Sequence, residues 1–223
     1  THIAAQLQKL YAFEDANLYR TLIVQSARLP GERYKDPRVE DLRYFGYGIP
    51  NLERATKNTD NRITLVTTAK ITAKKAHVYS VRIPEKLRRP GDRFNILVEV
   101  SLAFTARPRR TRRRLRSYLS TWLSWESSKL GESLDLFQAR VLKEVEADEE
   151  EVADIQGVIP WLIREQTNYG KTGLRRQDNS IQKSWCILES NQLTEEFSLA
   201  VVGHKGWNVK ADEDIPYALT VSF

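Results

Sequence analysis

The sequence predicts an α+β protein in which a short helical segment at the amino end precedes an antiparallel β-sandwich. Three observations support this prediction. Apolar residues recur at helical spacing over residues 1–56. From about residue 57 onward the apolar period changes to two, most clearly over residues 94–104. Turn-forming residues separate many such alternating runs, which is typical of a sandwich.

The helical part begins with a short amphipathic helix. Ala4 and Ala5 would let this helix lie close to a neighbour, because their side chains are small. Its apolar stripe consists of Ile3, Leu7, Leu10 and Tyr11.

A second helix is predicted from about Asp15 to Arg28. Pro30-Gly31 ends it, because proline cannot continue the hydrogen-bond ladder and glycine turns the chain. We expect its buried side to contain Leu18, Leu22, Ile23 and Ala27.

An aromatic and glycine-rich stretch, Tyr44 to Pro50, follows a polar loop. Gly46 and Gly48 indicate unusual backbone angles or close packing. One or two further helical turns are expected over residues 51–55, and Thr56–Asn61 is the expected linker.

The clearest strand is residues 94–104, where apolar residues form one buried face and Asn95, Glu99 and Ser101 lie between them. Residues 215–223 alternate in the same way. Shorter strands are expected at 63–67, 77–83, 118–125, 185–188 and 197–202.

Two helical patterns interrupt the strands, one over residues 134–145 and a shorter one over 155–165. No internal repeat is apparent. We therefore expect two domains, with helices over residues 1–56 and a β-sandwich accessory domain over 57–223.

Composition narrows the class of protein. The chain has 223 residues, of which 41% are hydrophobic and 29% charged, as in ordinary globular proteins. It has no apolar run of ~18 residues, so we expect no membrane partner. It has no methionine and opens in mid-helix, so we expect it to be a fragment of a longer protein.

The single cysteine, Cys186, excludes an internal disulfide and a zinc site built from thiolates. Its apolar, strand-like setting predicts a buried and inert thiol. The lack of disulfides favours a reducing, cytoplasmic compartment, although the sequence leaves the compartment open.

The net charge of +6 is unevenly distributed. An acidic run over residues 144–154 and a basic run over 107–116 carry equal and opposite formal charge, so they could neutralise each other. The basic run also allows an alternative function, nucleic-acid binding. The arginines concerned are Arg107, Arg109, Arg110, Arg112, Arg113, Arg114 and Arg116.

Aromatic residues follow the basic run closely. Tyr118, Trp122 and Trp125 could stack on bases, but their place in an amphipathic strand favours the protein core. A third function, a carbohydrate- or protein-binding sandwich, would use Trp161, Trp185 and Trp207 as a ligand platform.

No catalytic, metal-binding or cofactor-binding set can be assembled from this chain. Of the three histidines, we expect His77 to be structural because it faces the same way as Tyr79 and Val81, and His204 to lie in a turn between strands. Gly170-Lys171-Thr172-Gly173 lacks the upstream glycine and the strand-to-helix setting of a phosphate-binding loop.

The first 56 residues resemble the end of the catalytic domain of the subtilisin family of serine proteases. In that family the nucleophile lies in a G-T-S-x-A-x-P-H-[IV]-A-[AG] pattern, and Thr1-His2-Ile3-Ala4-Ala5 is similar to its end, with Thr1 in place of the proline. A second helix of the type found at residues 18–27 follows, and then a Y-G-x-G segment resembled by residues 45–52.

The remainder resembles the β-rich, jelly-roll-like extension that follows the protease core in some bacterial subtilases, chiefly through residues 197–203 and 216–222. The resemblance implies a serine endopeptidase acting on polypeptides. It places the nucleophilic serine roughly four positions before Thr1, with its aspartate and histidine further upstream. This chain would then be inactive alone and have a structural, regulatory or binding role, including self-association. His2 would be a buried packing residue.

Overall fold

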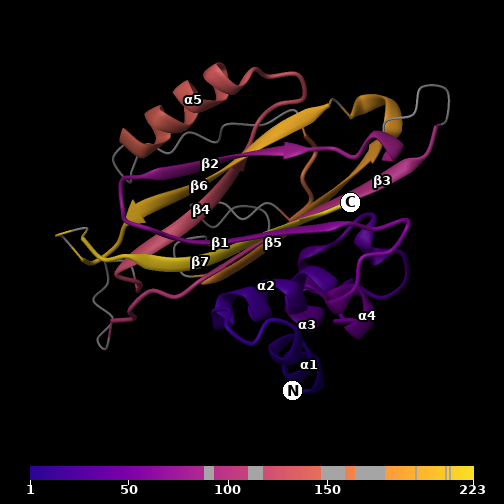
Figure 1. The fold of residues 1–223 in the computed structure, drawn as a ribbon, viewed down its shortest axis with the longest axis horizontal. Coiled ribbons are helices and arrows are strands. Elements are labelled where there is room, and N and C mark those ends of the chain that lie inside the picture. Colours follow the sequence, from indigo (N-terminus) through magenta and orange to yellow (C-terminus); the bar gives the residue numbers. More distant parts are fainter. Residues whose placement is uncertain are drawn as a thin grey trace.

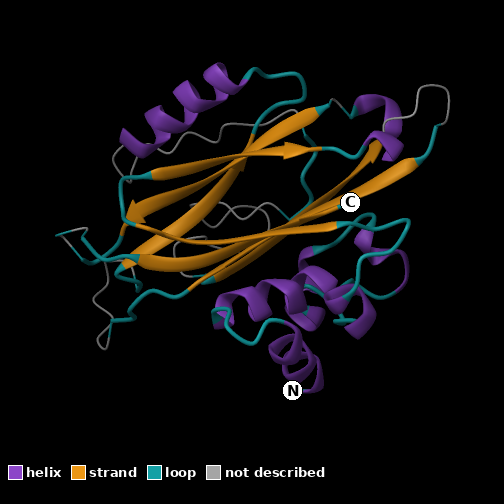
Figure 2. Cartoon of the chain, in the orientation of Figure 1, coloured by secondary structure: helices purple, strands orange, loops and turns teal. Residues whose placement is uncertain are grey.

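Two antiparallel sheets packed face to face form the centre of the molecule, and helices lie on their outer faces (Figures 1 and 2). The structure is a computed structural model that describes residues 1–87, 93–109, 118–146, 159–163, 179–193, 195–208, 210 and 212–223. Its strands are β1 (Thr64–Ile71), β2 (Ala76–Arg82), β3 (Asn95–Phe104), β4 (Thr121–Ser127), β5 (Ile181–Glu189), β6 (Glu196–Lys205) and β7 (Ile215–Ser222).

The strand order is β1-β7-β3-β5 in the larger sheet and β2-β6-β4 in the smaller one. Every connection between consecutive strands of the described part therefore crosses from one sheet to the other. All the ladders are antiparallel. The predicted α+β class and the sandwich-like arrangement of antiparallel sheets are confirmed.

The inner faces of the two sheets share one core. In β3, Val98, Val100 and Leu102 are at most 1% exposed. They belong to the same hydrophobic cluster as Leu199 and Val201 of the opposing sheet. The period of two seen in the sequence therefore marks the side chains that lie between the sheets.

Helices α1 to α4 lie against the outer face of the four-stranded sheet, and α5 lies against the outer face of the other (Figure 1). Short 3-10 turns occur at Gly31–Tyr34, Glu85–Leu87 and Ser190–Gln192. The helices are α1 (His2–Leu10), α2 (Ala16–Ser26), α3 (Val39–Phe45), α4 (Leu52–Thr56) and α5 (Leu134–Glu146).

Helix α2 is the element that joins the helical part to the sheet, because it contacts both β3 and β7. It begins at Asp15, whose carboxylate accepts a hydrogen bond of 2.7 Å from the backbone N–H of Asn17. The predicted buried side is confirmed for Leu18, Leu22 and Ala27, while Ile23 is partly buried.

Helix α1 forms as predicted, but its apolar stripe is only partly buried. Leu7 is 0% exposed and packs with Leu18, Leu22, Ala55 and Ala218. Leu10 is 57% exposed, so its expected burial is wrong. The described neighbours of α1 are α2 and α4, and they cover one side of the helix only.

The glycine-rich stretch is confirmed as a place of close packing. Gly48 has a φ of 103°, and a Cβ added there would lie 2.1 Å from the carbonyl carbon of Arg28. The contact is fixed by an antiparallel bridge between Arg28 and Ile49. Gly46 also has a positive φ, of 56°.

Several elements of the fold differ from what the sequence predicted. The described part of the helix predicted over 155–165, residues 159–163, is not helical, because the N–H of Leu162 donates 2.7 Å to the carbonyl of Trp185 at the sheet edge. The strand predicted at 118–125 begins at Thr121. Helix α3 was not expected from the sequence.

On the other side of the molecule, α5 covers the three-stranded sheet. Phe137 and Val141 are at most 1% exposed and pack on Ala200 and Val202 of β6. The helix predicted over 134–145 is therefore confirmed, with its apolar face on the sheet. None of the helices in the described ranges is long and apolar enough to cross a membrane.

Replacing Leu7 with alanine should lower the free energy of unfolding by about 2–5 kcal/mol, because it leaves a cavity among Leu18, Leu22 and Ala55. The matched control is Leu10→Ala in the same helix, which should change stability by less than about 0.5 kcal/mol. Urea unfolding followed by circular dichroism measures both. Equal losses for the two variants would contradict this packing.

Candidate functional site

The most distinctive polar arrangement lies between α2 and the outer face of the four-stranded sheet. Its centre is an ion pair between Lys183 Nζ and Glu99 Oε1, at 2.9 Å. Both side chains are at most 3% exposed. A buried ion pair needs further hydrogen bonds to offset the loss of hydration.

The ammonium group of Lys183 finds those bonds at the end of α2. It donates to the carbonyls of Val24 and Gln25 at 3.1 Å each, and to that of Ala27 at 2.6 Å. These carbonyls come from the last turn of a helix, where backbone acceptors lack partners and the helix dipole is negative. Lys183 on β5 therefore supplies hydrogen-bond donors to the carbonyls at the end of α2.

The carboxylate of Glu99 is surrounded by cations. Arg28 Nη2 lies 3.4 Å and Arg62 Nη2 4.0 Å from its Oε2, while Lys183 binds the other oxygen. Burial alone would raise the pKa of Glu99, but attraction to Lys183, Arg28 and Arg62 outweighs it and holds the pKa below its usual value. Glu99 is therefore an anion inside the fold.

Gln25 extends the network along the sheet. Its Nε2 donates to the carbonyl of Glu99 at 3.0 Å and to Ser222 Oγ at 2.6 Å. Its Oε1 accepts hydrogen bonds from Ser101 at 2.5 Å and Thr220 at 3.3 Å. Small hydroxyl side chains on this face of the sheet thus leave room for α2 and bond to it.

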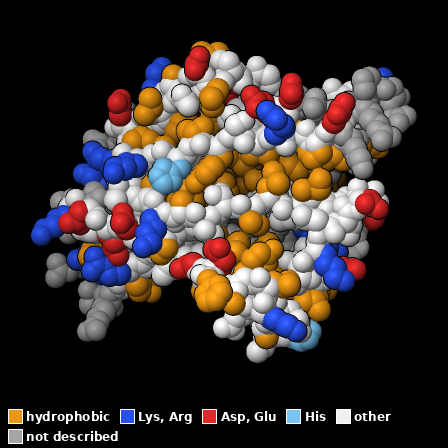
Figure 3. Space-filling view, viewed as in Figure 1, with side chains coloured by type: hydrophobic (Ala, Val, Ile, Leu, Met, Phe, Trp, Pro, Cys, Tyr) orange, Lys and Arg blue, Asp and Glu red, His pale blue; other side chains and the backbone are white. Residues whose placement is uncertain are grey.

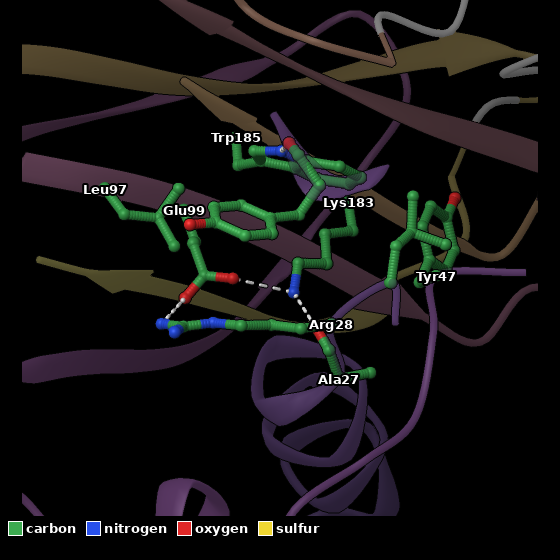
Figure 4. A pocket seen from close by; sticks show the side chains of 9 residues that line it. Ala27, Arg28, Tyr47, Leu97, Glu99, Lys183 and Trp185 are labelled. Atoms are coloured by element: carbon green, nitrogen blue, oxygen red, sulfur yellow. Dashed lines mark hydrogen bonds and ion pairs between the residues drawn. The ribbon is translucent and has the colours of Figure 1, made fainter. Parts of the chain in front are cut away.

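A small cavity of about 10 Å³ adjoins this cluster (Figure 4). Figure 4 shows Lys183 and Arg28 directed at Glu99, with Trp185 and Tyr47 beside them. The cavity has room for about one water molecule and none for a substrate. The arrangement therefore serves to bind α2 to the sheet, and it offers no access for catalysis.

A second polar group lies beneath α5. Ser124 Oγ is 2.7 Å from His204 Nε2, and Glu144 Oε1 is 4.0 Å from the same nitrogen. The indole of Trp122 stacks on the imidazole with centroids 3.7 Å apart. A serine–histidine–acid relay uses both ring nitrogens, one for the serine and one for the acid. Here the serine and the acid share Nε2, and Ser124 is 1% exposed, so this group is structural.

His204 therefore corrects the sequence-based expectation. It lies inside strand β6 and is 9% exposed, whereas a turn between strands was expected. The glycine on each side suggested a turn, but Gly203 has no room for a Cβ, which would lie 2.4 Å from the carbonyl oxygen of Thr72. Glu144, the first residue of the acidic run, is 6% exposed, because it lies in α5, which packs on this sheet.

The structure also shows the surroundings of the other residues that the sequence analysis named. His77 Nδ1 lies 2.7 Å from the hydroxyl of Tyr217, which confirms a structural role. Burial raises the pKa of the Cys186 thiol, and Cys186 is 0% exposed, as expected of an inert thiol. His2 is exposed, so its expected burial is wrong for this chain. Residues 170–173 lie outside the described residues.

The described end of the basic run is paired within the fold. Arg107 Nε lies 2.7 Å from Glu213 Oε1, and its guanidinium is 6.0 Å from the ring centre of Trp207. This acid precedes β7 and does not belong to the 144–154 run. Arg109 is also described, and the other five arginines lie outside the described residues: Arg110, Arg112, Arg113, Arg114 and Arg116.

The tryptophans do not share one surface. Trp122 and Trp125 are at most 4% exposed, which confirms their place in the core. Trp161 packs edge-on against Trp125. Trp185 lies under the helical part and donates 2.6 Å to the carbonyl of Tyr34. With Trp207 beside Arg107, the three-tryptophan ligand platform does not form.

Sequence reasoning missed the Glu99–Lys183 pair. The alternation on β3 correctly placed Glu99 and Ser101 on the face of the sheet that points away from the core. Helix α2 covers this face, so both residues are at most 2% exposed. The available signal was the run of short hydroxyl residues on the same face, Thr220 and Ser222, which is typical of a covered surface. In the described ranges, no group of three His, Cys, Asp or Glu residues is placed to hold a metal ion.

Comparison with known proteins gives a distant similarity to a protein of unassigned function. No protein-family model matches this chain. The "Uncharacterized protein y4bN" of Sinorhizobium fredii (strain NBRC 101917 / NGR234) is 25% identical over 225 residues. The match covers 98% of this chain and 49% of the relative, so the chain spans about half the length of the protein that it matches.

The buried ammonium group can be tested by replacing Lys183 with methionine, which keeps most of the volume and removes the charge. We expect the free energy of unfolding to fall by about 3–5 kcal/mol, because the carbonyls of α2 and one oxygen of Glu99 lose their partner. Lys70→Met, at an exposed position on β1, is the control. A loss below about 1 kcal/mol in chemical denaturation would contradict this role.

The buried carboxylate of Glu99 should make the folded protein less stable at low pH. Its pKa is lower in the folded than in the unfolded chain, so the unfolded chain binds more protons between the two values. Stability from Glu99 is therefore complete above the usual value of 4.5 and is lost as the pH falls through the folded pKa. Between about pH 5 and pH 2, the Glu99→Gln variant should lose less stability than the wild type. Glu53→Gln, an exposed control, should follow the wild-type curve.

Proposed function

We propose that this chain is the carboxy-terminal part of a subtilisin-like serine endopeptidase. Residues 1–56 would be the last helices of the catalytic domain, and 57–223 a jelly-roll-like accessory domain. The nucleophile, its base and the orienting aspartate would lie upstream. The chain would contribute no catalytic residue, and the intact protein would bind the polypeptide substrate.

The observation that carries this proposal is the arrangement of the helical part. The segment that resembles the end of the nucleophile pattern, His2–Leu10, is helical, and its turn leads directly into the capped helix α2. The Gly46–Gly48 segment then follows with the positive φ angles that the glycines suggested. These three segments thus have the type of local structure expected of them, although His2 and Leu10 are exposed.

The exposed side chains of the helical part support a larger protein around it. Phe13 is 103%, Tyr44 82% and Ile49 62% exposed, in addition to Leu10. Figure 3 shows hydrophobic side chains at the surface over the helical end as well as over the sheets. Large exposed apolar groups gathered on one part of a fold are typical of a covered interface. The greater length of the relative y4bN is compatible with such additional chain.

The strand order supports a jelly-roll-like accessory domain. In the described part, connections always cross between the sheets, and the last strand, β7, lies between β1 and β3. Jelly rolls are double-sheet folds built of two Greek keys with eight strands. The seven strands of the described ranges fit that plan in their order.

The accessory domain would have a structural and regulatory role. Lys183 of the sandwich bonds to the end of α2, and Gln25 of α2 bonds in turn to the sheet. Ala218 of β7 belongs to the same apolar cluster as Leu7 of α1. In an intact protease the sandwich would thereby position the helix that begins behind the nucleophile, with the positive end of the helix dipole toward the serine. Self-association through the accessory domain remains a prediction.

Nucleic-acid binding by the basic run remains a separate prediction. The pairing of Arg107 with Glu213 reduces the free charge at the described end of the run. Steep loss of duplex binding between low and moderate salt would favour this alternative.

The test compares this chain with the longer protein encoded by the gene. We expect the 223-residue chain to leave casein intact and the longer protein to cleave it. Replacing the upstream serine by alanine should reduce cleavage by roughly 10³-fold or more. The upstream sequence should also contain D-[ST]-G, H-G-[ST]-H and G-T-S segments. Casein cleavage by the isolated chain, or an upstream sequence without these segments, would overturn the proposal.

A further inference from the structure

The two edges of the four-stranded sheet have different surroundings. At the β5 edge, the N–H of Leu162 donates to the carbonyl of Trp185, and the Trp185 indole donates to Tyr34, so other segments cover this edge. Strand β1, at the opposite edge, pairs with β7 on one side and has no strand partner on its other side among the described residues (Figure 1). Open edge strands present peptide groups that can pair with another chain.

The ladder with β7 determines which peptide groups of β1 are directed outward. Ile63 and Phe223 exchange both of their backbone hydrogen bonds, at 3.2 and 3.0 Å. Successive residues of an antiparallel strand direct these groups to opposite sides, so odd-numbered residues of β1 face β7 and even-numbered ones face outward. The N–H of Thr64 agrees with this assignment, because it donates to Asn58 Oδ1 at 2.9 Å.

The outward-facing peptide groups of β1 beyond Thr64 therefore belong to Val66, Thr68 and Lys70. The register with β7 continues from Thr64 to Ile71 without a bulge. The strand contains no proline, and Lys70 is its single charged residue. Val66 is 44% exposed. Exposed edge strands of high β-propensity and low charge are typical places of association between chains.

The outer face of β1 carries charges of both signs. Ala69 and Ile71 pack in the core between the sheets, so the even-numbered side chains face the helical part. On that face Thr68 Oγ1 donates to Glu14 Oε2 at 3.4 Å, and the exposed Lys70 follows two residues later. Within the described residues neither Glu14 nor Lys70 has an ion-pair partner.

The edge of β1 is complementary to itself. Two copies of β1 related by a two-fold axis run antiparallel. With the axis at Thr68, this residue lies opposite its own counterpart, and Val66 lies opposite Lys70 of the other copy. Each open N–H then meets an open carbonyl. A register that places Thr64 opposite Lys70 would instead use an N–H that Asn58 already binds.

The same register brings opposite charges together. Lys70 of one copy lies diagonal to Thr68 of the other, at a separation that long side chains can span. Its ammonium group can therefore reach the Glu14 carboxylate that Thr68 binds. The two Glu14 and two Lys70 side chains around the axis balance each other in charge.

We propose that two copies of this chain associate through the open edge of β1 and join their four-stranded sheets into one. The partner is a second copy because one strand supplies both the matching peptide groups and, with Glu14, both charges. The proposal gives the predicted self-association a surface. It does not rest on the protease assignment, because it uses only β1 and the residues beside it.

Sedimentation velocity of the 223-residue chain, from about 1 µM to 1 mM, measures the association, since an interface of two edge strands is small. We expect a dimer whose dissociation constant rises at least about tenfold in Thr68→Pro. Proline removes the outward N–H and spares the ladder with β7, which is where edge strands tolerate it. Ser80→Pro, at the open edge of β2, is the matched control and should dimerise like the wild type.

A charge exchange tests the register without proline. Lys70→Glu should weaken the dimer about tenfold because it meets Glu14, and adding Glu14→Lys to it should restore wild-type association. Lys143→Glu, the same change on α5, should have no effect.

Hydrogen exchange gives a further readout, because the amides of Val66, Thr68 and Lys70 should become protected as the protein concentration rises. A chain that stays monomeric throughout, or Thr68→Pro dimers as strong as those of the wild type, would overturn the proposal. So would a failure of the double charge exchange to restore the dimer, or amides already protected in the dilute monomer.

Discussion

The ammonium group of Lys183 lies where the end of α2, the strand β5 and the carboxylate of Glu99 meet. The helix supplies carbonyls of its last turn, and the sheet supplies the opposite charge. Neither could be buried without the other, because an unpaired carbonyl or carboxylate in this position would lose its hydration without compensation. The placement of the helical part on the sheet depends on this contact.

This contact also bears on how the chain is organised. The predicted border between residues 56 and 57 follows the change of apolar period, yet α2 is bound to strands from both the middle and the end of the chain through Gln25 and Lys183. If the helices belong to a catalytic domain, that domain and the sandwich share a polar, buried interface. A change in one would then be transmitted to the other through α2, which suits a regulatory role for the sandwich.

The elements with strong periodicity were predicted from sequence. The strands around Val98 and Leu219 and the helix around Leu18 have side chains whose burial follows from one repeating pattern. The prediction failed where a residue's environment comes from a distant segment. Leu10 belongs to the apolar stripe of α1, but α2 and α4 leave it exposed. His204 lies between two glycines that suggest a turn, but it belongs to strand β6, which α5 covers.

The sequence by itself determined the elements with strong periodicity, such as α2, β3 and β7, and which face of these strands lies between the sheets, because these properties depend on local spacing. Only the tertiary structure decided that the second face of β3 is covered and that Lys183 binds the end of α2. Those features depend on which distant segments become neighbours, and the charge of Glu99 or Lys183 gives no information on its partner until the sheet and the helix are brought together.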